Sequence, residues 1–307
     1  MKNIFIIGAG AIGKTLAVAL KLSDKNVVLV RGSIDDDSES VETIQIITGA
    51  GAKLEAQIEI STFSRFPALE GIVVLTNKSF GNETLARTLK IKAKNSPLVI
   101  LQNGLEVERP FIDGNFPEIY RCVLFVTCQT MSENQIRFKP VTVSPIGVIE
   151  GNSANLQAIV EQLNTSVFQF KTETDIQTVV WKKAIINSVF NSICPLLDVD
   201  NGVFHREARV LDVAKRVIAE CVAIAKESGI TLATDELVES VLFISKSSDG
   251  QLISTLQDIK NKRQTEIETL NFEIVNFARK LNRENAVTET KLLGELTRLK
   301  SDLTRAS

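Results

Sequence analysis

The chain has 307 residues with a formal charge of -2 at pH 7, and 44% of its residues are hydrophobic. This length can bury one or two sizeable cores, so two domains are the first expectation. The charge provides no basic field for nucleic acid, and no apolar run approaches the roughly 20 residues of a membrane span. The first apolar stretch is too short and too rich in glycine for a signal peptide. We therefore expect a cytoplasmic protein with neither a nucleic-acid nor a membrane partner.

Cysteine and histidine usage argues against a metal site. The four cysteines form no Cys-x-x-Cys pair, and His205 is the only histidine, so no metal is expected. We interpret the cysteines as reduced cytosolic thiols. A lone histidine also argues against a Ser-His-Asp triad, and a surface or capping position after the Asn201-Gly202 turn is the favoured interpretation of His205.

The N-terminal segment carries the strongest motif. An apolar strand at residues 4–7 runs directly into Gly-Ala-Gly-Ala-Ile-Gly, which opens a predicted helix at residues 11–22. Gly8 permits the tight turn, Gly10 lets a pyrophosphate approach the backbone, and Gly13 allows the helix to pack closely on the strand. The unpaired N–H groups of the helix then face a phosphate. The predicted dinucleotide-binding residues here are Gly8, Ala9, Gly10, Ala11, Ile12 and Gly13.

The first half of the chain alternates strands with helices. Its strands read as short aliphatic runs, which are typical of strands buried on both faces. This order predicts a mostly parallel, doubly wound sheet, followed by a more β-rich section. The expected strands are 4–7, 27–30, 72–75, 98–101, 120–126, 135–143, 146–149 and 167–171, and the expected helices are 11–22, 82–93 and 154–163.

From about residue 174 the pattern becomes helical. Gly229, Gly250 and the Asn201-Gly202 pair punctuate it. The expected helices are 176–193, 207–228, 235–245, 252–282 and 287–299. The predicted fold is therefore α/β, with a Rossmann-type dinucleotide-binding domain at residues 1–173 and an all-helical second domain at residues 174–307.

The end of the second strand favours one cofactor. An acidic residue there would hold the ribose hydroxyls of NAD, but the strand at 27–30 ends in Arg31. A guanidinium suits a 2′-phosphate, and Lys78 adds a second cation after the strand at 72–75. We therefore favour NADP(H). The acids at 35–37 are either a solvated loop or a displaced ribose ligand.

Two rows of polar side chains recur at intervals of four, the spacing of one helix face. Lys183, Asn187 and Asn191 interrupt an apolar helix, which predicts a polar cleft inside the protein. The alternative is a capping network with a snorkelling lysine. The second row has an aliphatic side at Ile259, Ile267, Leu270 and Ile274, and its alternative is a solvated charged face. This second row consists of Ser254, Asp258, Lys262 and Glu266.

Asn103 follows the predicted strand at 98–101. Ligands of open α/β sheets lie beyond the carboxyl ends of the strands, so Asn103 is placed to touch the nicotinamide end or the substrate. A plain turn asparagine before Gly104 is the alternative on local grounds.

In this order and spacing, the motifs resemble the 2-dehydropantoate 2-reductase (ketopantoate reductase) family over nearly the whole chain. They are the glycine fingerprint, Arg31, Lys78, Gln102-Asn103-Gly104, Lys183-x-x-x-Asn187-x-x-x-Asn191, Asn201-Gly202, and the segments 254–258 and 265–268.

The resemblance implies that NADPH delivers a hydride to the C2 carbonyl of ketopantoate, giving (R)-pantoate for pantothenate and coenzyme A synthesis. It implies that Lys183 protonates the emerging alkoxide and that Glu266 orients Lys183 while binding substrate or cofactor. Asn103 would contact both cofactor and substrate. An ammonium suits this role because it stabilises the oxyanion and supplies its proton. The other implied substrate-binding residues are Asn187, Asn191, Asn201 and Ser254.

Two departures from the family pattern keep alternatives open. The stretch 125–142 lacks the usual glycine-rich turns, and Phe272 stands where a small residue is common. The first alternative is a related NAD(P)H-dependent reductase of another branched 2-oxo acid. The second is a non-catalytic NADP-binding sensor, which would bind its ligand without turnover. We expect a small-molecule substrate and either a monomer or a homodimer.

Overall fold

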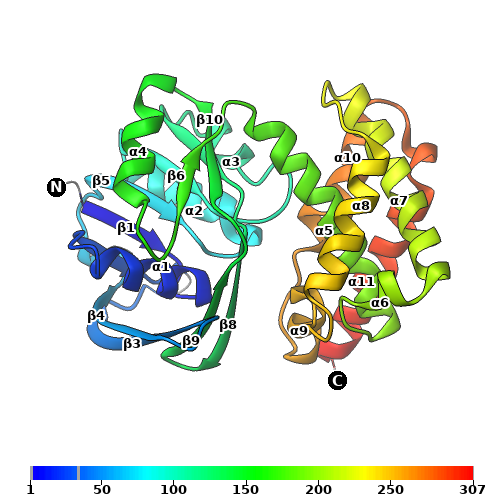
Figure 1. Ribbon diagram of the computed structural model, residues 1–307. Coiled ribbons are helices and arrows are strands. Elements are labelled where there is room, and N and C mark those ends of the chain that lie inside the picture. The colour runs from blue at the N-terminus through cyan, green and yellow to red at the C-terminus, as the bar shows by residue number, and fades with distance from the viewer. Residues whose placement is uncertain (1–2, 33–34, 307) are drawn as a thin grey trace. The chain divides into compact units, whose positions relative to one another are not determined.

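The computed structural model describes residues 3–32 and 35–306, and the chain divides into two compact units (Figure 1). The first unit takes the chain up to Gln102 together with Val107–Ile176, and the second takes Asn103–Glu106 together with the chain from Gln177 onward. The change of unit after Ile176 lies near the expected boundary at 173/174, and the short segment Asn103–Glu106 belongs with the helical unit. No helix in the described part of the chain is long and apolar enough to cross a membrane.

One sheet organises the first unit. In the described residues it has 11 strands in the order β11-β10-β7-β6-β5-β1-β2-β4-β3-β9-β8. Seven of the ten strand pairs are parallel, which confirms the predicted α/β fold with a mostly parallel sheet. The strands are β1 Asn3–Ile7, β2 Val27–Val30, β3 Ser40–Thr48, β4 Lys53–Ser61, β5 Gly71–Leu75, β6 Leu98–Ile100, β7 Ile119–Cys122, β8 Val126–Ser132, β9 Gln135–Pro140, β10 Ser144–Glu150 and β11 Phe170–Thr172.

Helices cover both faces of this sheet. Successive side chains of a strand point to opposite sides, so one strand contacts helices on both faces. Ile4 and Ile6 of β1 pack in one cluster with α1 (Ala11–Lys21) and α4 (Leu156–Leu163). Phe5 and Ile7 pack in the other with α2 (Asn82–Lys92) and α3 (Arg109–Asp113). Both faces of β1 are therefore buried, which explains its continuous apolar sequence.

The antiparallel hairpin of β3 and β4 was not predicted from the sequence. These strands pair along their whole length, with Ile44 opposite Ala56, and β4 adds to β2 in parallel. Their residues alternate between polar and apolar, unlike the aliphatic runs that identified the other strands. The predicted strand 120–126 is also two strands, since β7 ends at Cys122 and β8 begins at Val126. The stretch 125–142 forms the hairpin β8–β9, which pairs with β3 through β9.

The second unit is helical, as predicted. Its helix α7 packs against α8, α10 and α11. Short 3-10 turns connect several elements, including η4 at Ile267–Thr269. The helices are α5 Ile176–Leu197, α6 Val203–Arg206, α7 Ala208–Glu227, α8 Thr234–Ser247, α9 Ser254–Lys260, α10 Asn271–Lys280 and α11 Thr288–Ala306.

The predicted long helix at 252–282 is wrong, because the chain turns after Lys260. Lys262 adopts φ 54° in the left-handed region. Its N–H bonds to Ile259 O at 3.0 Å, and the N–H of Arg263 bonds to Asp258 O at 2.8 Å. This pair of bonds is the Schellman helix ending, in which glycine is the usual left-handed residue. Because lysine occupies that position, the sequence did not indicate the end of the helix.

The break also corrects the second polar row. Only Ser254 and Asp258 share a helix, α9, whereas Lys262 lies in the turn and Glu266 precedes η4. The aliphatic residues on its expected inner side are nevertheless buried, although they lie on α9, on η4, on α10 and at the cap between η4 and α10. They are Ile259, Ile267, Leu270 and Ile274.

Candidate functional site

The glycine turn between β1 and α1 is fixed by close backbone contacts. Gly8 has φ +118°, and a Cβ there would lie 2.6 Å from Asn77 N. A Cβ on Gly13 would overlap the carbonyl oxygen of Gly8. Both positions therefore require glycine for the reasons that the sequence predicted, a tight turn and close helix packing.

Gly10 differs from these two, because a Cβ there would meet nothing within 4 Å. Gly10 is also the N-cap of α1, and it offers no capping side chain. The first turn of α1 carries no acidic residue. An uncapped helix N-terminus beside open space suits an anion that accepts its backbone N–H groups, so these residues fit the pyrophosphate of a dinucleotide.

Thr76, just after β5, completes this turn and was not predicted. Its hydroxyl donates to the carbonyl oxygen of Gly8 at 2.9 Å. It is also among the atoms that a Cβ on Gly13 would strike. The signal in the sequence was only a threonine at the end of a buried strand, which has many ordinary explanations.

Arg31 follows β2, as predicted, and lies in a small charged cluster. Its Nη1 donates to Ser38 Oγ at 3.1 Å, and its Nη2 lies 3.5 Å from Glu42 Oε1. The other oxygen of Glu42 lies 3.8 Å from Lys14 Nζ. Lys14 in turn donates to Asn134 Oδ1 at 2.7 Å, so it ties α1 to the β8–β9 turn. Glu42 was not predicted, because the sequence analysis missed the strand that carries it.

The acids at 35–37 contact the protein itself. Asp35 Oδ1 accepts from Ser64 N at 2.7 Å, and Asp36 Oδ1 accepts from Ser38 N at 3.1 Å. Asp37 lies 3.8 Å from Arg65. The other predicted cation, Lys78, is the N-cap of a short 3-10 turn, η2 (Ser79–Gly81), and Asn77 Nδ2 donates to its carbonyl oxygen at 2.9 Å.

In the helical unit, α5 carries Lys183, Asn187 and Asn191 as predicted. Asn191 is only 3% exposed, and its Nδ2 donates to Asn187 O at 3.0 Å. Its Oδ1 accepts from Ser254 Oγ at 3.2 Å and from Thr255 N at 3.3 Å. Asn191 therefore joins the polar face of α5 to the N-terminus of α9, and it brings three of the predicted residues together.

Asn103 and Glu266 lie on two segments of the helical unit that contact each other. Thr269 N donates to Glu266 O at 3.2 Å, and Thr269 O accepts from Leu105 N at 2.8 Å. A Cβ on Gly104, whose φ is +103°, would overlap the side chain of Thr269. Glycine at 104 thus lets the segment that begins with Asn103 pack directly on the turn that follows Glu266.

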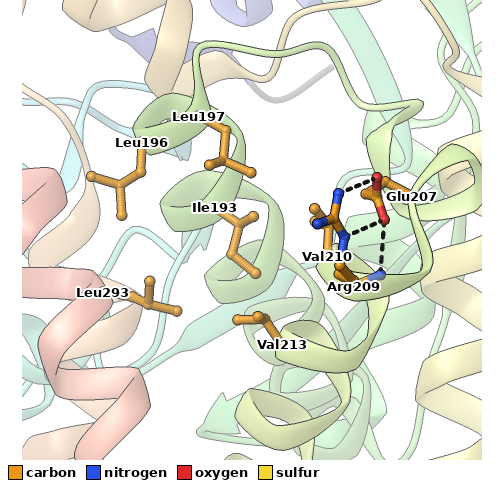
Figure 2. Close-up of a pocket in the computed structure, with 8 residues that line it drawn as sticks. All are labelled: Ile193, Leu196, Leu197, Glu207, Arg209, Val210, Val213 and Leu293. Carbon is orange, nitrogen blue, oxygen red and sulfur yellow. Dashed lines mark hydrogen bonds and ion pairs between the residues drawn. The ribbon is translucent and has the colours of Figure 1, made fainter.

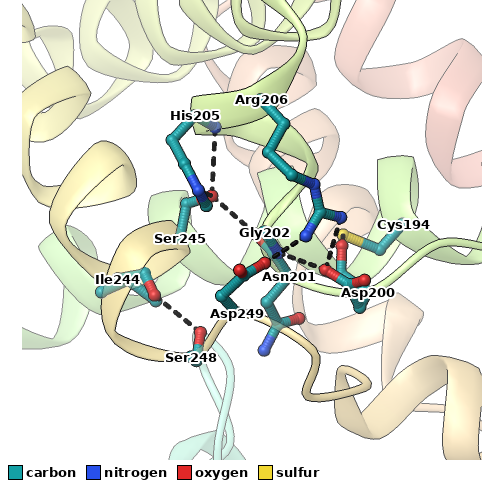
Figure 3. A network of polar contacts seen from close by, with 10 residues as sticks. All are labelled: Cys194, Asp200, Asn201, Gly202, His205, Arg206, Ile244, Ser245, Ser248 and Asp249. Atoms are coloured by element: carbon teal, nitrogen blue, oxygen red, sulfur yellow. Dashed lines mark hydrogen bonds and ion pairs between the residues drawn. The ribbon is translucent and has the colours of Figure 1, made fainter.

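Asn201 lies in a polar network between α5 and α6 (Figure 3). Its N–H bonds to Gln251 O at 2.9 Å, and its carbonyl oxygen accepts from Ser245 Oγ at 2.8 Å. His205 Nδ1 lies 3.0 Å from the same serine hydroxyl. The Asn201 side chain extends away from His205, and its buried Oδ1 has no hydrogen-bond partner. An unpaired buried acceptor is costly, so it is suited to a donor on a bound molecule.

Charges hold the turn that presents Asn201. Arg206 donates to Asp200 Oδ1 at 2.8 Å and also pairs with Asp249. Burial pushes the pKa of Asp200 upward, but the Gly202 N–H and Arg206 outweigh it and hold the pKa below its usual value. A Cβ on Gly202 would overlap Asp249 and Arg206, so this glycine makes room for the ion pairs.

Three of the four cysteines have a raised pKa. All four are free thiols. Burial raises the pKa of Cys128, Cys194 and Cys221 to about 12. These three therefore stay protonated at neutral pH, and the thiolate is the form that reacts as a nucleophile or binds a metal.

A Rossmann-type sheet with this glycine turn, joined to a helical unit with a polar α5 face, defines an oxidoreductase with an NAD(P)-binding domain. Two family models that match this chain narrow this class of oxidoreductases to one family. The model described as "Ketopantoate reductase PanE/ApbA" matches residues 4–147, and "Ketopantoate reductase PanE/ApbA C terminal" matches residues 175–298. The chain belongs to the ketopantoate reductase family, which makes it an NAD(P)H-dependent 2-oxo acid reductase and confirms the resemblance seen in the sequence.

Individual relatives are distant but match over nearly the full length. The 2-dehydropantoate 2-reductase of Pyrococcus abyssi is 25% identical over 286 residues, covering 92% of this chain and 93% of its own. That of Halobacterium salinarum is 24% identical over 308 residues, covering 97% and 98%.

Solved structures show the same fold. A D-mandelate dehydrogenase with NADH and anilino(oxo)acetate superposes with a TM-score of 0.83 at 22% identity, covering 98% of this chain and 99% of its own. A dimeric ketopantoate reductase from Staphylococcus aureus superposes with a TM-score of 0.82 at 18% identity and the same coverage.

Proposed function

We propose that this protein reduces 2-dehydropantoate (ketopantoate) to (R)-pantoate with NADPH, and that Lys183 is the proton donor. The observation that carries the proposal is the polar face of α5. Lys183, Asn187 and Asn191 recur at intervals of four along α5, and Asn191 hydrogen-bonds both Asn187 O and Ser254 Oγ, so it links this face to the start of α9. Full-length relatives named 2-dehydropantoate 2-reductase support the choice of substrate.

The nucleotide half of the proposal rests on the first unit. When bound, the dinucleotide supplies the hydride, and this chain supplies binding and orientation. The backbone from Gly8 to Gly13 holds the pyrophosphate at the N-terminus of α1. Arg31 and Lys78 are proposed to hold the 2′-phosphate of NADPH, because a guanidinium pairs well with a phosphate. The acids at 35–37 already contact the protein, which favours the loop interpretation over a ribose ligand.

The substrate half rests on the helical unit. Negative charge develops on the carbonyl oxygen during reduction, and the Lys183 ammonium stabilises it and then gives up a proton from Nζ. Glu266 is proposed to orient Lys183 and to contact substrate or cofactor. Asn103 is proposed to contact both. The amides of Asn187, Asn191 and Asn201 and the hydroxyl of Ser254 are proposed to hold the carboxylate and hydroxyl groups of the substrate.

A separate observation supports one alternative to ketopantoate and NADPH. The likeness to a D-mandelate dehydrogenase that was solved with NADH supports a different 2-oxo acid as substrate and NADH as cofactor. Phe272 does not favour this alternative, because its ring lies 4.4 Å from the guanidinium carbon of Arg298 and beside Gly294, both on α11. We therefore assign the bulk of Phe272 to helix packing and keep ketopantoate as the substrate.

The direct test is oxidation of NADPH followed by absorbance with purified protein. Ketopantoate should be reduced with a higher kcat/KM than phenylglyoxylate or 2-oxoisovalerate, and NADPH should be used better than NADH. A higher kcat/KM with either of the other acids would reject the substrate. Tight binding of NADPH with no turnover of any of the three would favour the sensor alternative.

A further inference from the structure

His205 is the only histidine of the chain, and the proposed reduction gives it no role. It lies in the four-residue helix α6, and its side chain is half-buried. Figure 3 shows that it reaches Ser245 of α8, which is fully buried. The sequence favoured a surface or capping position, whereas the structure places the ring in the polar network around Asn201, one of the proposed substrate-binding residues.

The hydroxyl of Ser245 contacts three groups. Its Oγ lies 2.8 Å from the carbonyl oxygen of Asn201, 3.2 Å from the backbone nitrogen of His205 and 3.0 Å from Nδ1 of the same histidine. A hydroxyl has one proton to donate and two lone pairs that accept. A carbonyl oxygen only accepts, so the single proton of Ser245 goes to Asn201. The backbone N–H of His205 donates to Ser245 Oγ, which leaves one lone pair for a second donor.

These contacts determine the tautomer of His205. If Nδ1 lacked its proton, its own lone pair would compete with the Asn201 carbonyl oxygen for the one proton of Ser245. With the proton on Nδ1, all three contacts of the hydroxyl are hydrogen bonds, as is normal for a buried polar group. Nε2 is then the unprotonated nitrogen of the neutral ring.

The network fixes the backbone of Asn201 and leaves its side chain available. The N–H of Asn201 donates to Gln251 O at 2.9 Å, and its carbonyl oxygen accepts from Ser245. Asn201 is only 7% exposed, yet its Oδ1 has no hydrogen-bond partner in the part of the chain that the structure describes. Because both backbone groups are held, the direction of this side chain is set by the network.

Arg209, four residues after His205, offers a comparison outside this network. Its Nε donates to Glu207 Oε1 at 3.1 Å, at the edge of an apolar groove of about 410 Å³ between α5 and α7 (Figure 2). The Arg209 side chain is 88% exposed. It can therefore be removed without changing the hydrogen bonds of Ser245.

We propose that His205 and Ser245 are positioning residues for substrate binding at Asn201. The Nδ1–H of His205 orients the Ser245 hydroxyl, and the hydroxyl holds the Asn201 carbonyl oxygen. The Asn201 side chain then keeps its unpaired Oδ1 available to the substrate. This role rests on the proposed binding of substrate by Asn201. It sets the affinity for the 2-oxo acid and takes no part in the transfer of the hydride or the proton.

Nitrogen-15 NMR of the full chain, prepared without a histidine tag, tests the tautomer directly. Because His205 is the only histidine, its ring gives the only imidazole signals, and they need no assignment to a residue. Above about pH 8, where histidine rings are usually neutral, we expect a protonated Nδ1 and an unprotonated Nε2. The opposite tautomer would overturn the proposal, because its Nδ1 could not donate to Ser245. This measurement does not depend on turnover or on the identity of the substrate.

Steady-state kinetics of four variants, with the 2-oxo acid that wild type reduces best, test the role in binding. His205→Ala and Ser245→Ala should raise KM about 3- to 10-fold, the equivalent of one lost hydrogen bond, with kcat and the Kd for NADPH within about twofold of wild type. His205→Asn should restore KM, because its amide N–H can replace Nδ1–H. Arg209→Ala should match wild type. If Ser245→Ala does not fold, the His205 variants carry the test. Unchanged KM in His205→Ala, or a His205→Asn variant that is equally impaired, would overturn the proposal.

A double-mutant cycle with Asn201→Ala shows whether His205 acts through Asn201. If it does, His205→Ala should raise KM no further once Asn201 has lost its amide. An equal increase of KM in both backgrounds would overturn the proposal, since His205 would then act elsewhere. Unchanged KM in Asn201→Ala alone would reject substrate binding by Asn201, and the positioning role with it. Turnover of ketopantoate by wild type reports on the proposed reduction separately, so the two failures are distinguishable.

Discussion

Glu42 Oε1 lies 3.5 Å from Arg31 Nη2, so a carboxylate from β3 partly neutralises the arginine that follows β2. Ser40 Oγ also donates to Glu42 Oε1, at 3.1 Å. A 2′-phosphate bound to Arg31 would meet this carboxylate as a like charge and a competitor. If Arg31 holds the 2′-phosphate as proposed, Glu42 limits how strongly it favours NADPH over NADH.

Replacing Arg31 tests the cofactor proposal. In Arg31→Ala the Kd for NADPH should rise roughly tenfold to a hundredfold, since hydrogen bonds to charged groups contribute about 1.5–3 kcal/mol. The Kd for NADH should stay nearly constant, because NADH lacks the phosphate. Quenching of protein fluorescence measures both. Arg65→Ala is the matched control, because Arg65 pairs with Glu39 nearby and should affect neither cofactor. Equal losses for both cofactors in Arg31→Ala would contradict the role.

Replacing Glu42 should change the affinity for NADPH in the opposite direction. Glu42→Gln should lower the Kd for NADPH about two- to fivefold, in keeping with the 0.2–1 kcal/mol of partly exposed ion pairs. The gain should shrink as salt is added, because salt screens the repulsion that has been removed. NADH binding should not change. Weaker NADPH binding by Glu42→Gln would show instead that the carboxylate holds Arg31 in its binding position.

Replacing Asn191 should mainly lower the stability of the protein, whereas replacing Asn187 should mainly weaken substrate binding. Asn191→Ala leaves Ser254 Oγ and Thr255 N without their acceptor, so the free energy of unfolding should fall by about 1–3 kcal/mol and Tm by several degrees. Asn187 contributes its backbone carbonyl to this network, and alanine keeps that carbonyl. Asn187→Ala should therefore raise KM with a smaller loss of Tm. Thermal unfolding and steady-state kinetics of the two variants, side by side, decide this, and a larger Tm loss in Asn187→Ala would contradict it.

The three thiols with a raised pKa should react slowly in the folded protein. With the pKa of Cys128, Cys194 and Cys221 raised from 9 to about 12, their thiolate fraction at pH 8 is negligible. Native protein should react slowly with Ellman's reagent, and unfolding should release all four thiols quickly. The unfolded chain loses these protons near pH 9 while the folded one keeps them, so stability should fall as pH rises above about 9. Fast labelling of the native protein at pH 8 would contradict this.

The glycine turn and the buried strands could be predicted because a single physical requirement determines the residue types in each of them. Gly8 and Gly13 have no room for a Cβ, and the strand before them is buried on both faces. The hairpin of β3 and β4 was hidden because its alternating residues lack that continuous apolar signal. Glu42 lies on β3, so its place beside Arg31 could not be predicted either.

The helical unit shows a second limit of sequence reasoning. The spacing of Lys183, Asn187 and Asn191 correctly placed them on one helix. The same argument failed for Lys262 and Glu266, because the end of α9 depends on a lysine in the left-handed region, where periodicity carries no signal. The contact of Leu105 with Thr269 joins residues 164 positions apart (269 - 105), and only the folded chain reveals it.

The central claim is that Lys183 protonates the product of ketopantoate reduction, and one measurement tests it most directly. Turnover of ketopantoate with NADPH is compared for wild type, Lys183→Ala and Lys182→Ala, with the Kd for NADPH measured for each. Lys182 is the matched control, because it lies beside Lys183 on α5 and its ammonium pairs with Glu236 at 3.1 Å. We expect Lys183→Ala to lose about 10²–10⁴ in kcat with NADPH binding intact, the range for a lost general acid, and Lys182→Ala to keep its activity. Unchanged kcat in Lys183→Ala would contradict the account.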